Sequence, residues 1–145
     1  MIAEYLNRQD ARWRRVVATI LLVEDQPNQQ LLYQLVLEDD GYCVERADGI
    51  DVAIQILNET MIDLVVLDLG LSDRRALDLL RFIRIHYPHM QVVAFTGSAR
   101  SDFLPDKWVR YLMKSSNIDA LRREVKRGLA QSNTQEITQG GNIDD

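Results

Sequence analysis

Four short apolar runs, each closed by a polar or charged residue, constrain the fold of this chain more than any other feature. These runs end at Glu24-Asp25, Asp68, Thr96 and Lys114. Short runs rich in Val, Ile and Leu are typical of strands buried on both faces of a sheet. With one further short run, they predict five strands at roughly 19–24, 43–47, 62–68, 91–96 and 109–113.

Segments with helical spacing of apolar residues separate these strands. The residues that define the predicted apolar faces are Leu31, Leu32, Leu35 and Val36, then Val52, Ala53, Ile56 and Leu57, then Leu77, Leu80 and Ile83, and finally Ile118, Leu121, Val125 and Leu129. Alternating strands and helices indicate βαβ units around a parallel sheet. The predicted fold is α/β, a doubly wound five-stranded parallel sheet in the flavodoxin-like order 2-1-3-4-5.

Two terminal segments fall outside this pattern. Residues 1–18 predict an extra N-terminal helix, because Ile2, Tyr5, Leu6, Trp13, Val16 and Val17 approximate one apolar face beside several arginines. Packing on its own domain is the favoured interpretation, ahead of docking to a partner or a second copy, and then of contact with a membrane surface. Residues 131–145 are polar and predict a flexible tail. The expected divisions are therefore 1–18, 19–130 and 131–145.

Composition narrows the class of protein. A net charge of −5 argues against nucleic-acid binding, since phosphate backbones attract basic surfaces. The single cysteine, Cys43, excludes an internal disulfide and is expected to be buried in its strand. No apolar run reaches the ~20 residues that cross a bilayer, and no signal peptide is evident, so a cytoplasmic location without membrane insertion is expected.

The strand ends suggest a chemistry. Carboxyl ends of parallel strands meet at one edge of a sheet, so Glu24, Asp25 and Asp68 are expected to converge. Three neighbouring carboxylates repel one another, and a hard divalent cation such as Mg²⁺ or Mn²⁺ relieves that repulsion. Asp68 is then a candidate nucleophile for a phosphoryl group, with Lys114 as a positive charge and Thr96 as a hydroxyl donor for its oxygens. Taken singly, each of these residues could be an ordinary surface or turn residue. Their occurrence together favours a phosphoryl-accepting site.

These motifs resemble the receiver domain of two-component response regulators, of the stand-alone, chemotaxis type. The resemblance covers about residues 18–130 and rests on the segments 21–27, 63–69, 95–97 and 111–114. It implies that Asp68 accepts a phosphoryl group from a phosphohistidine of a sensor histidine kinase or a histidine phosphotransfer protein. It also implies that the backbone carbonyl of Gly70 joins Glu24, Asp25 and Asp68 as a Mg²⁺ ligand. Thr96 and Tyr111 would then relay the phosphorylated state to an output protein not yet identified.

The same resemblance implies a domain that catalyses only its own phosphorylation and dephosphorylation, with a homodimer as a further option. The chain departs from the family pattern between Thr96 and Lys114. Residues 97–108 lack apolar periodicity and include Pro105, so the family's fourth helix is expected to be shortened or irregular. Gly70 and Ser98, two positions beyond Asp68 and Thr96, are small and predict water access to the acyl phosphate.

Two alternatives remain open. The first is a pseudo-receiver, an interaction module that works without phosphorylation, which the unusual 97–108 segment favours. The second is an enzyme of similar fold, such as a haloacid-type phosphatase or a flavin binder. Its discriminating features are absent, because Gly70 replaces the second acid of an Asp-x-Asp motif and no Gly-rich phosphate loop follows the first strand.

Overall fold

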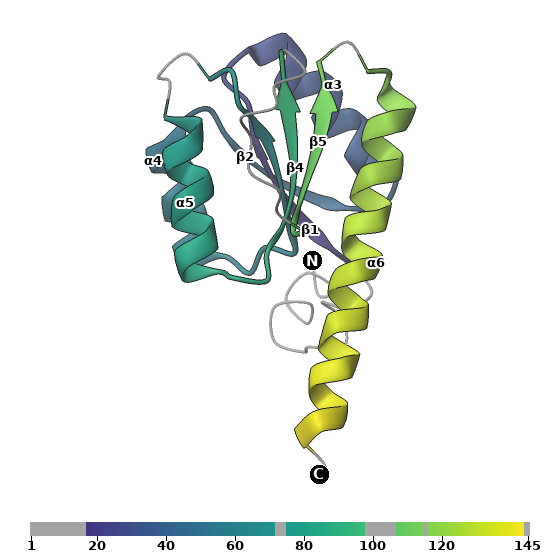
Figure 1. Cartoon of the computed structure of the whole chain (residues 1–145). Helices are drawn as coiled ribbons and strands as arrows, with labels where there is room; N and C mark the ends of the chain where they lie inside the picture. Colours follow the sequence, from purple (N-terminus) through teal and green to yellow (C-terminus); the bar gives the residue numbers. More distant parts are fainter. Residues whose placement is uncertain (1–16, 72–74, 98–106, 115, 144–145) are drawn as a thin grey trace, which may run out of the picture.

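A five-stranded parallel sheet forms the centre of the molecule (Figure 1). The computed structural model describes residues 17–71, 75–97, 107–114 and 116–143, of which 133–143 by backbone alone. The strands are β1 (Thr19–Val23), β2 (Cys43–Ala47), β3 (Leu64–Asp68), β4 (Gln91–Thr96) and β5 (Val109–Met113). Their order, β2-β1-β3-β4-β5, confirms the predicted topology, and the predicted strand limits hold to within two residues.

Burial along the strands follows their place in the sheet. Every residue of the inner strands β3 and β4 is buried, as the continuous apolar runs predict. The edge strand β2 carries the charged residues Glu45 and Arg46, and only its last residue, Ala47, is fully buried. Cys43 begins this edge strand and is exposed, so the prediction that it is buried was wrong.

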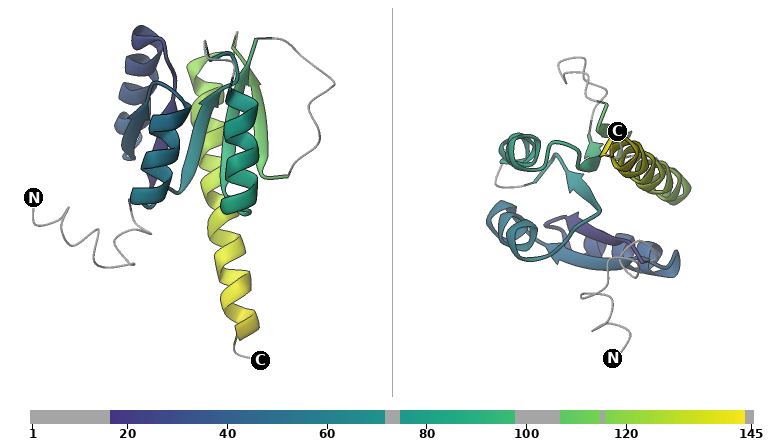
Figure 2. Two further views of the ribbon diagram at one scale, coloured as in Figure 1. Left: turned by 90° about the vertical axis from the view of Figure 1, so that its left-hand side faces the viewer. Right: turned by 90° about the horizontal axis from the view of Figure 1, so that it is seen from below.

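Two pairs of helices cover the two faces of the sheet (Figure 2). The helices α4 (Ile50–Glu59) and α5 (Ala76–His86) pack on one face, with a core that includes Val23, Leu67 and Leu79. The helices α3 (Pro27–Asp39) and α6 (Ile118–Ile143) pack on the other, with a core that includes Leu22 and Phe95. The sheet therefore lies between two helical layers, as a doubly wound fold requires.

Helix α3 does not bury the face that its sequence predicts. Leu31, Leu32 and Leu35 are 51%, 47% and 56% exposed, and Leu37 is the one fully buried residue of the helix. Leu77 on α5 is also exposed, although it was expected on an apolar face, because Ala76, Leu79 and Ile83 turn inward instead. Spacing identified the helices correctly and misjudged which side of α3 meets the sheet.

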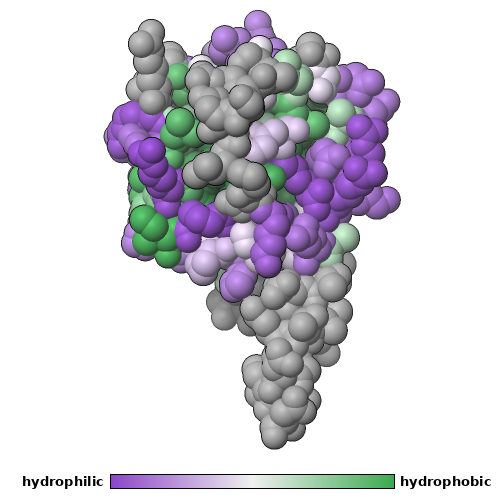
Figure 3. Space-filling view, viewed as in Figure 1, coloured by the Kyte–Doolittle hydropathy of each residue, from purple (hydrophilic) through white to green (hydrophobic). Residues whose placement is uncertain are grey.

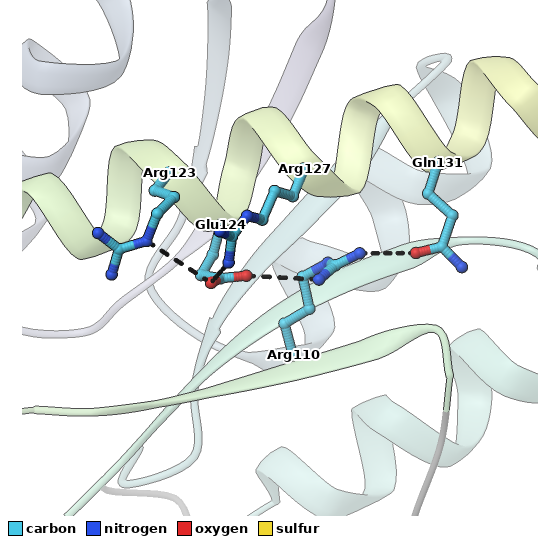
Figure 4. A network of polar contacts seen from close by, with 5 residues as sticks. All are labelled: Arg110, Arg123, Glu124, Arg127 and Gln131. Carbon is cyan, nitrogen blue, oxygen red and sulfur yellow. Dashed lines mark hydrogen bonds and ion pairs between the residues drawn. The ribbon is translucent and has the colours of Figure 1, made fainter.

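Helix α6 begins at an Asn cap and is anchored to β5. The side-chain carbonyl of Asn117 accepts a hydrogen bond from the backbone N–H of Ala120 at 2.9 Å. One turn on, the carboxylate of Glu124 is shared by Arg110 of β5, Arg123 and Arg127, and Arg110 also donates to Gln131 at 2.7 Å (Figure 4). These contacts hold the middle of the helix against the sheet.

The helix then continues past the sheet to Ile143 (Figure 1). Residues 131–143, which the composition predicted to be part of a flexible polar tail, are helical in the structure. Extending an anchored helix avoids the costly nucleation step, so a segment of poor intrinsic helix propensity can still continue it. The expected domain limit at 130 stays a prediction.

Two predicted features lie outside the described residues. The extra N-terminal helix would fall within residues 1–16, and most of the irregular 97–108 segment, including Ser98, falls within 98–106. The part of the chain that the structure describes contains four helices, none of them between β4 and β5. None of these helices is long and apolar enough to cross a membrane.

Candidate functional site

Three carboxylates meet at the edge of the sheet where β1 and β3 end. The register aligns Val23 with Leu67, so Glu24 and Asp68 follow at the same level of adjacent strands. One oxygen from each of Glu24, Asp25 and Asp68 lies within 4.8 Å of the others. Glu24 and Asp68 are 3% and 2% exposed, and Asp25 is half-buried. The predicted convergence of these three acids is therefore present in the structure.

Burial and repulsion act on the charge of Glu24. Desolvation raises the pKa of Glu24 from 4.5 to about 7, the Asp68 carboxylate adds to the rise, and a hydrogen bond from the backbone N–H of Gln26 opposes it. Because the negative charge of Glu24 is unfavourable in this buried position, a cation beside the carboxylate would stabilise the charged form. The donors are all hard oxygens, which suits Mg²⁺ or Mn²⁺. The residues of this acidic site therefore fit a divalent metal.

Lys114 supplies a positive charge to the same edge. Its ammonium Nζ lies 3.1 Å from Oδ2 of Asp68. The backbone N–H of Lys114 donates to the carbonyl of Thr96 at 2.9 Å, which fixes the ends of β4 and β5 side by side. Thr96 is the last residue of β4 and is 7% exposed. Four of the predicted residues, Asp68, Glu24, Asp25 and Lys114, thus contact or adjoin one another, with Thr96 on the neighbouring strand end.

The loop after β3 wraps closely around Asp68. The backbone N–H of Gly70 donates to Oδ1 of Asp68 at 2.8 Å. A Cβ atom at Gly70 would lie 3.3 Å from that oxygen and 3.3 Å from Nζ of Lys114, tighter than an ordinary contact. Glycine at this position therefore keeps open the space between the acid and the ammonium.

Tyr111 lies at some distance along the sheet from this cluster. It pairs in register with Ala94, two residues before Thr96, and is half-buried against the core on the α4 and α5 face. Its predicted relay role, the predicted carbonyl ligand of Gly70 and the water-access role of Ser98 stay predictions.

Two residues of α3 that the sequence did not single out also belong to the site. The side-chain amide of Gln30 donates to the carbonyl of Glu24 at 2.9 Å and to that of Ala47 at 3.5 Å. Tyr33 stacks on Phe95, with ring centroids 5.0 Å apart. Burial raises the pKa of Tyr33, and the negative charges of Glu24 and Asp68 add to the rise. With Leu37, these residues form the i, i+3, i+7 stripe that α3 turns inward, and that spacing was the available signal.

Comparison with known proteins agrees with this architecture. The family model of the response regulator receiver domain matches residues 20–126. A solved CheY-like receiver domain protein from Methanospirillum hungatei superposes with a TM-score of 0.76 at 24% identity, covering 82% of this chain and 98% of that one. The response regulator TrrA from Thermotoga maritima, solved with Mg²⁺ and BeF, gives a TM-score of 0.69 at 29% identity, covering 77% and 99%.

Two sequence relatives have different lengths. The alginate biosynthesis transcriptional regulatory protein AlgB of Pseudomonas putida is 36% identical over 76% of this chain, which spans a quarter (25%) of that protein. Sporulation initiation phosphotransferase F of Bacillus subtilis is 25% identical over 76% of this chain and 92% of its own length. The fold and the acidic edge define a signalling domain rather than a conventional enzyme. The chain belongs to the response regulator receiver family of two-component signalling.

Proposed function

We propose that this chain is a phosphorylatable receiver in which Asp68 accepts a phosphoryl group. The observation that carries the proposal is the placement of Asp68, a buried carboxylate that has two acids within 4.8 Å and an ammonium at 3.1 Å. An oxygen of Asp68 would attack phosphorus while the bond from phosphorus to a donor imidazole nitrogen breaks. The imidazole keeps the electron pair and takes up a proton.

The surrounding side chains have separate roles in this proposal. Glu24, Asp25 and Asp68 would hold the divalent ion, with the backbone carbonyl of Gly70 as the further ligand that the family resemblance implies. When bound, the ion supplies positive charge to the phosphoryl oxygens. Lys114 would move from Asp68 to a phosphoryl oxygen, because the attacking carboxylate oxygen gives up its charge when it becomes bonded to phosphorus.

Thr96 and Tyr111 would carry the change outward. A hydroxyl at the end of β4 can turn towards a new phosphoryl oxygen, and such a contact favours one of two local arrangements. Tyr111 is half-buried on β5 and would respond to that movement. The phosphoryl donor would be a histidine kinase or a histidine phosphotransfer protein. The output would be a separate protein that binds the changed surface.

The direct test is intact-mass measurement after incubation with acetyl phosphate and Mg²⁺. We expect one phosphoryl adduct on the wild-type chain and none on Asp68→Ala. The matched control is Asp78→Asn, because Asp78 is an exposed acid on α5 that pairs with Arg81 at 3.5 Å. An adduct that persists in Asp68→Ala would place the acceptor elsewhere. No adduct on a folded, Mg²⁺-binding wild type, including with phosphohistidine donors, would favour the pseudo-receiver.

A further inference from the structure

Helix α3 presents its most apolar face to solvent. Leu31, Leu32 and Leu35 stand at i, i+1 and i+4, so their side chains form one stripe on the side opposite Leu37. Scattered exposed leucines are common on protein surfaces, whereas three that are adjacent and half-exposed form an apolar patch, which is a feature of interaction surfaces.

The N-terminal residues of this same chain have the complementary chemistry. Residues 1–16 contain the apolar side chains Ile2, Tyr5, Leu6, Trp13 and Val16 and four arginines against two acids, a net charge of +2. Because the whole chain has a net charge of −5, the remaining residues carry −7. A basic, amphipathic segment is therefore joined to a strongly acidic domain.

The start of β1, which the N-terminal residues precede in the sequence, lies beside the C-terminal end of α3. The backbone carbonyl of Ala18, just before β1, accepts a hydrogen bond from Cys43 at 2.9 Å, and Cys43 follows the short turn that ends α3. That end of the helix carries Glu38, Asp39 and Asp40 in succession, of which Arg122 contacts the two aspartates. The described chain thus begins near three acids, and Arg14 and Arg15 closely precede Val17 in the sequence.

The lengths also match. Sixteen residues in helical form span about 24 Å and the 13 residues of α3 about 20 Å, at about 1.5 Å per residue. If the arginines lay near the acidic end of α3, the apolar residues further towards Met1 would be level with the leucine stripe. We propose that residues 1–16 lie along α3 and cover Leu31, Leu32 and Leu35, with their arginines facing Glu38 and Asp39. This arrangement does not depend on phosphorylation of Asp68.

Trp13 reports on this contact. The chain has two tryptophans, and Trp108 is buried, so Trp108→Phe leaves Trp13 as the sole emitter. In this full-length background we expect blue-shifted emission and weak quenching by acrylamide. Replacing Leu31 and Leu35 by serine should raise the quenching constant several-fold. If circular dichroism shows that Trp108→Phe is unfolded, the difference between wild-type and Trp13→Phe spectra gives the same signal.

The matched control uses α5, which exposes Leu77 and Ile85, and hydrophobic side chains gather on that side of the molecule (Figure 3). Leu77→Ser with Ile85→Ser should leave Trp13 quenching unchanged. Glu38→Lys, or 0.5 M salt, should increase quenching, because both weaken attraction to the arginines. Free access of acrylamide to Trp13 in the parent, or equal responses to the α3 and α5 substitutions, would overturn the proposal.

Sedimentation of the same samples separates a second copy from the proposed occupant. We expect a monomer before and after the α3 substitutions. A dimer that dissociates when Leu31 and Leu35 are replaced would assign the stripe to a second copy of the chain and overturn the intramolecular contact.

Discussion

The side-chain carboxyl group of Glu24 lies in a buried position that disfavours its charged form. Because the pKa of Glu24 is about 7 in the folded protein and 4.5 ordinarily, folding takes up a proton between these values. The resulting stabilisation is complete below about pH 4.5 and is lost as the pH rises through about 7. Glu24 therefore lowers the stability of the metal-free protein at alkaline pH.

Thermal unfolding in EDTA between pH 5 and pH 8.5 measures this contribution. We expect Glu24→Gln to be more stable than the wild type at pH 8.5 by several degrees, because the amide has no charge to desolvate, and the difference should shrink towards pH 5. Glu59→Gln, which changes an exposed acid, should follow the wild type throughout. A constant difference across the whole range would mean that the effect is not titration of Glu24.

Gly70 controls the space around Asp68. In Gly70→Ala the new Cβ would crowd both Oδ1 of Asp68 and Nζ of Lys114, so the ammonium has to shift. We expect phosphorylation by acetyl phosphate to slow several-fold. Gly70→Asn should also slow hydrolysis of the adduct, because its side chain shields the phosphoryl group from water. Adduct formation and decay can be followed by intact mass.

The matched control is Gly97→Ala at the end of β4, where an added Cβ meets no described atom within 4 Å. Its adduct should form and decay at wild-type rates. Equal rates for Gly70→Ala and the wild type would show that Lys114 does not need its present position for the reaction.

At the scale of elements, the shared carboxylate of Glu124 fastens α6 to the sheet. Glu124 is largely buried and contacts three arginines, so Glu124→Gln removes the charge that balances them. We expect a loss of about 1–3 kcal/mol in the free energy of unfolding, measured by urea denaturation. Asp119→Asn alters a largely exposed acid 4.0 Å from Arg122 and should change stability by less than about 0.5 kcal/mol. A similar loss for both variants would contradict the role given to the network.

The strands were predictable because burial on both faces leaves a continuous apolar run, and because the acids, Thr96 and Lys114 follow those runs directly. The orientation of α3 was not predictable from its leucines. Gln30 and Tyr33 face inward because they have partners there, the carbonyl of Glu24 and the ring of Phe95. Hydrophobic periodicity does not register such polar and aromatic contacts. Helical residues 131–143 were missed because helix extension from a packed stem depends on tertiary structure rather than on local composition.

For the molecule as a whole, the acidic site links metal binding to stability. A ligand that binds only the folded state at 100 times its dissociation constant adds about 2.7 kcal/mol, or about 5–10 °C in a domain of this size. We expect Mg²⁺ and Mn²⁺ to raise the melting temperature of the wild type, and more at pH 8 than at pH 6, because protons compete for Glu24. Asp25→Asn should reduce the shift and Asp78→Asn should retain it. An equal shift in Asp25→Asn and wild type would mean that the metal binds elsewhere.

The stack of Tyr33 on Phe95 joins the outer helix α3 to the strand that ends at Thr96. Any coupling through this contact between phosphorylation of Asp68 and binding at α3 must act equally in both directions, because thermodynamic coupling is reciprocal. If a phosphoryl group at Asp68 shifts β4 and thereby changes how strongly α3 holds a bound segment, then that segment must change the free energy of the phosphorylated state by the same amount. A segment that merely covers the leucine stripe of α3 would thus act as an effector of the lifetime of the phosphorylated state.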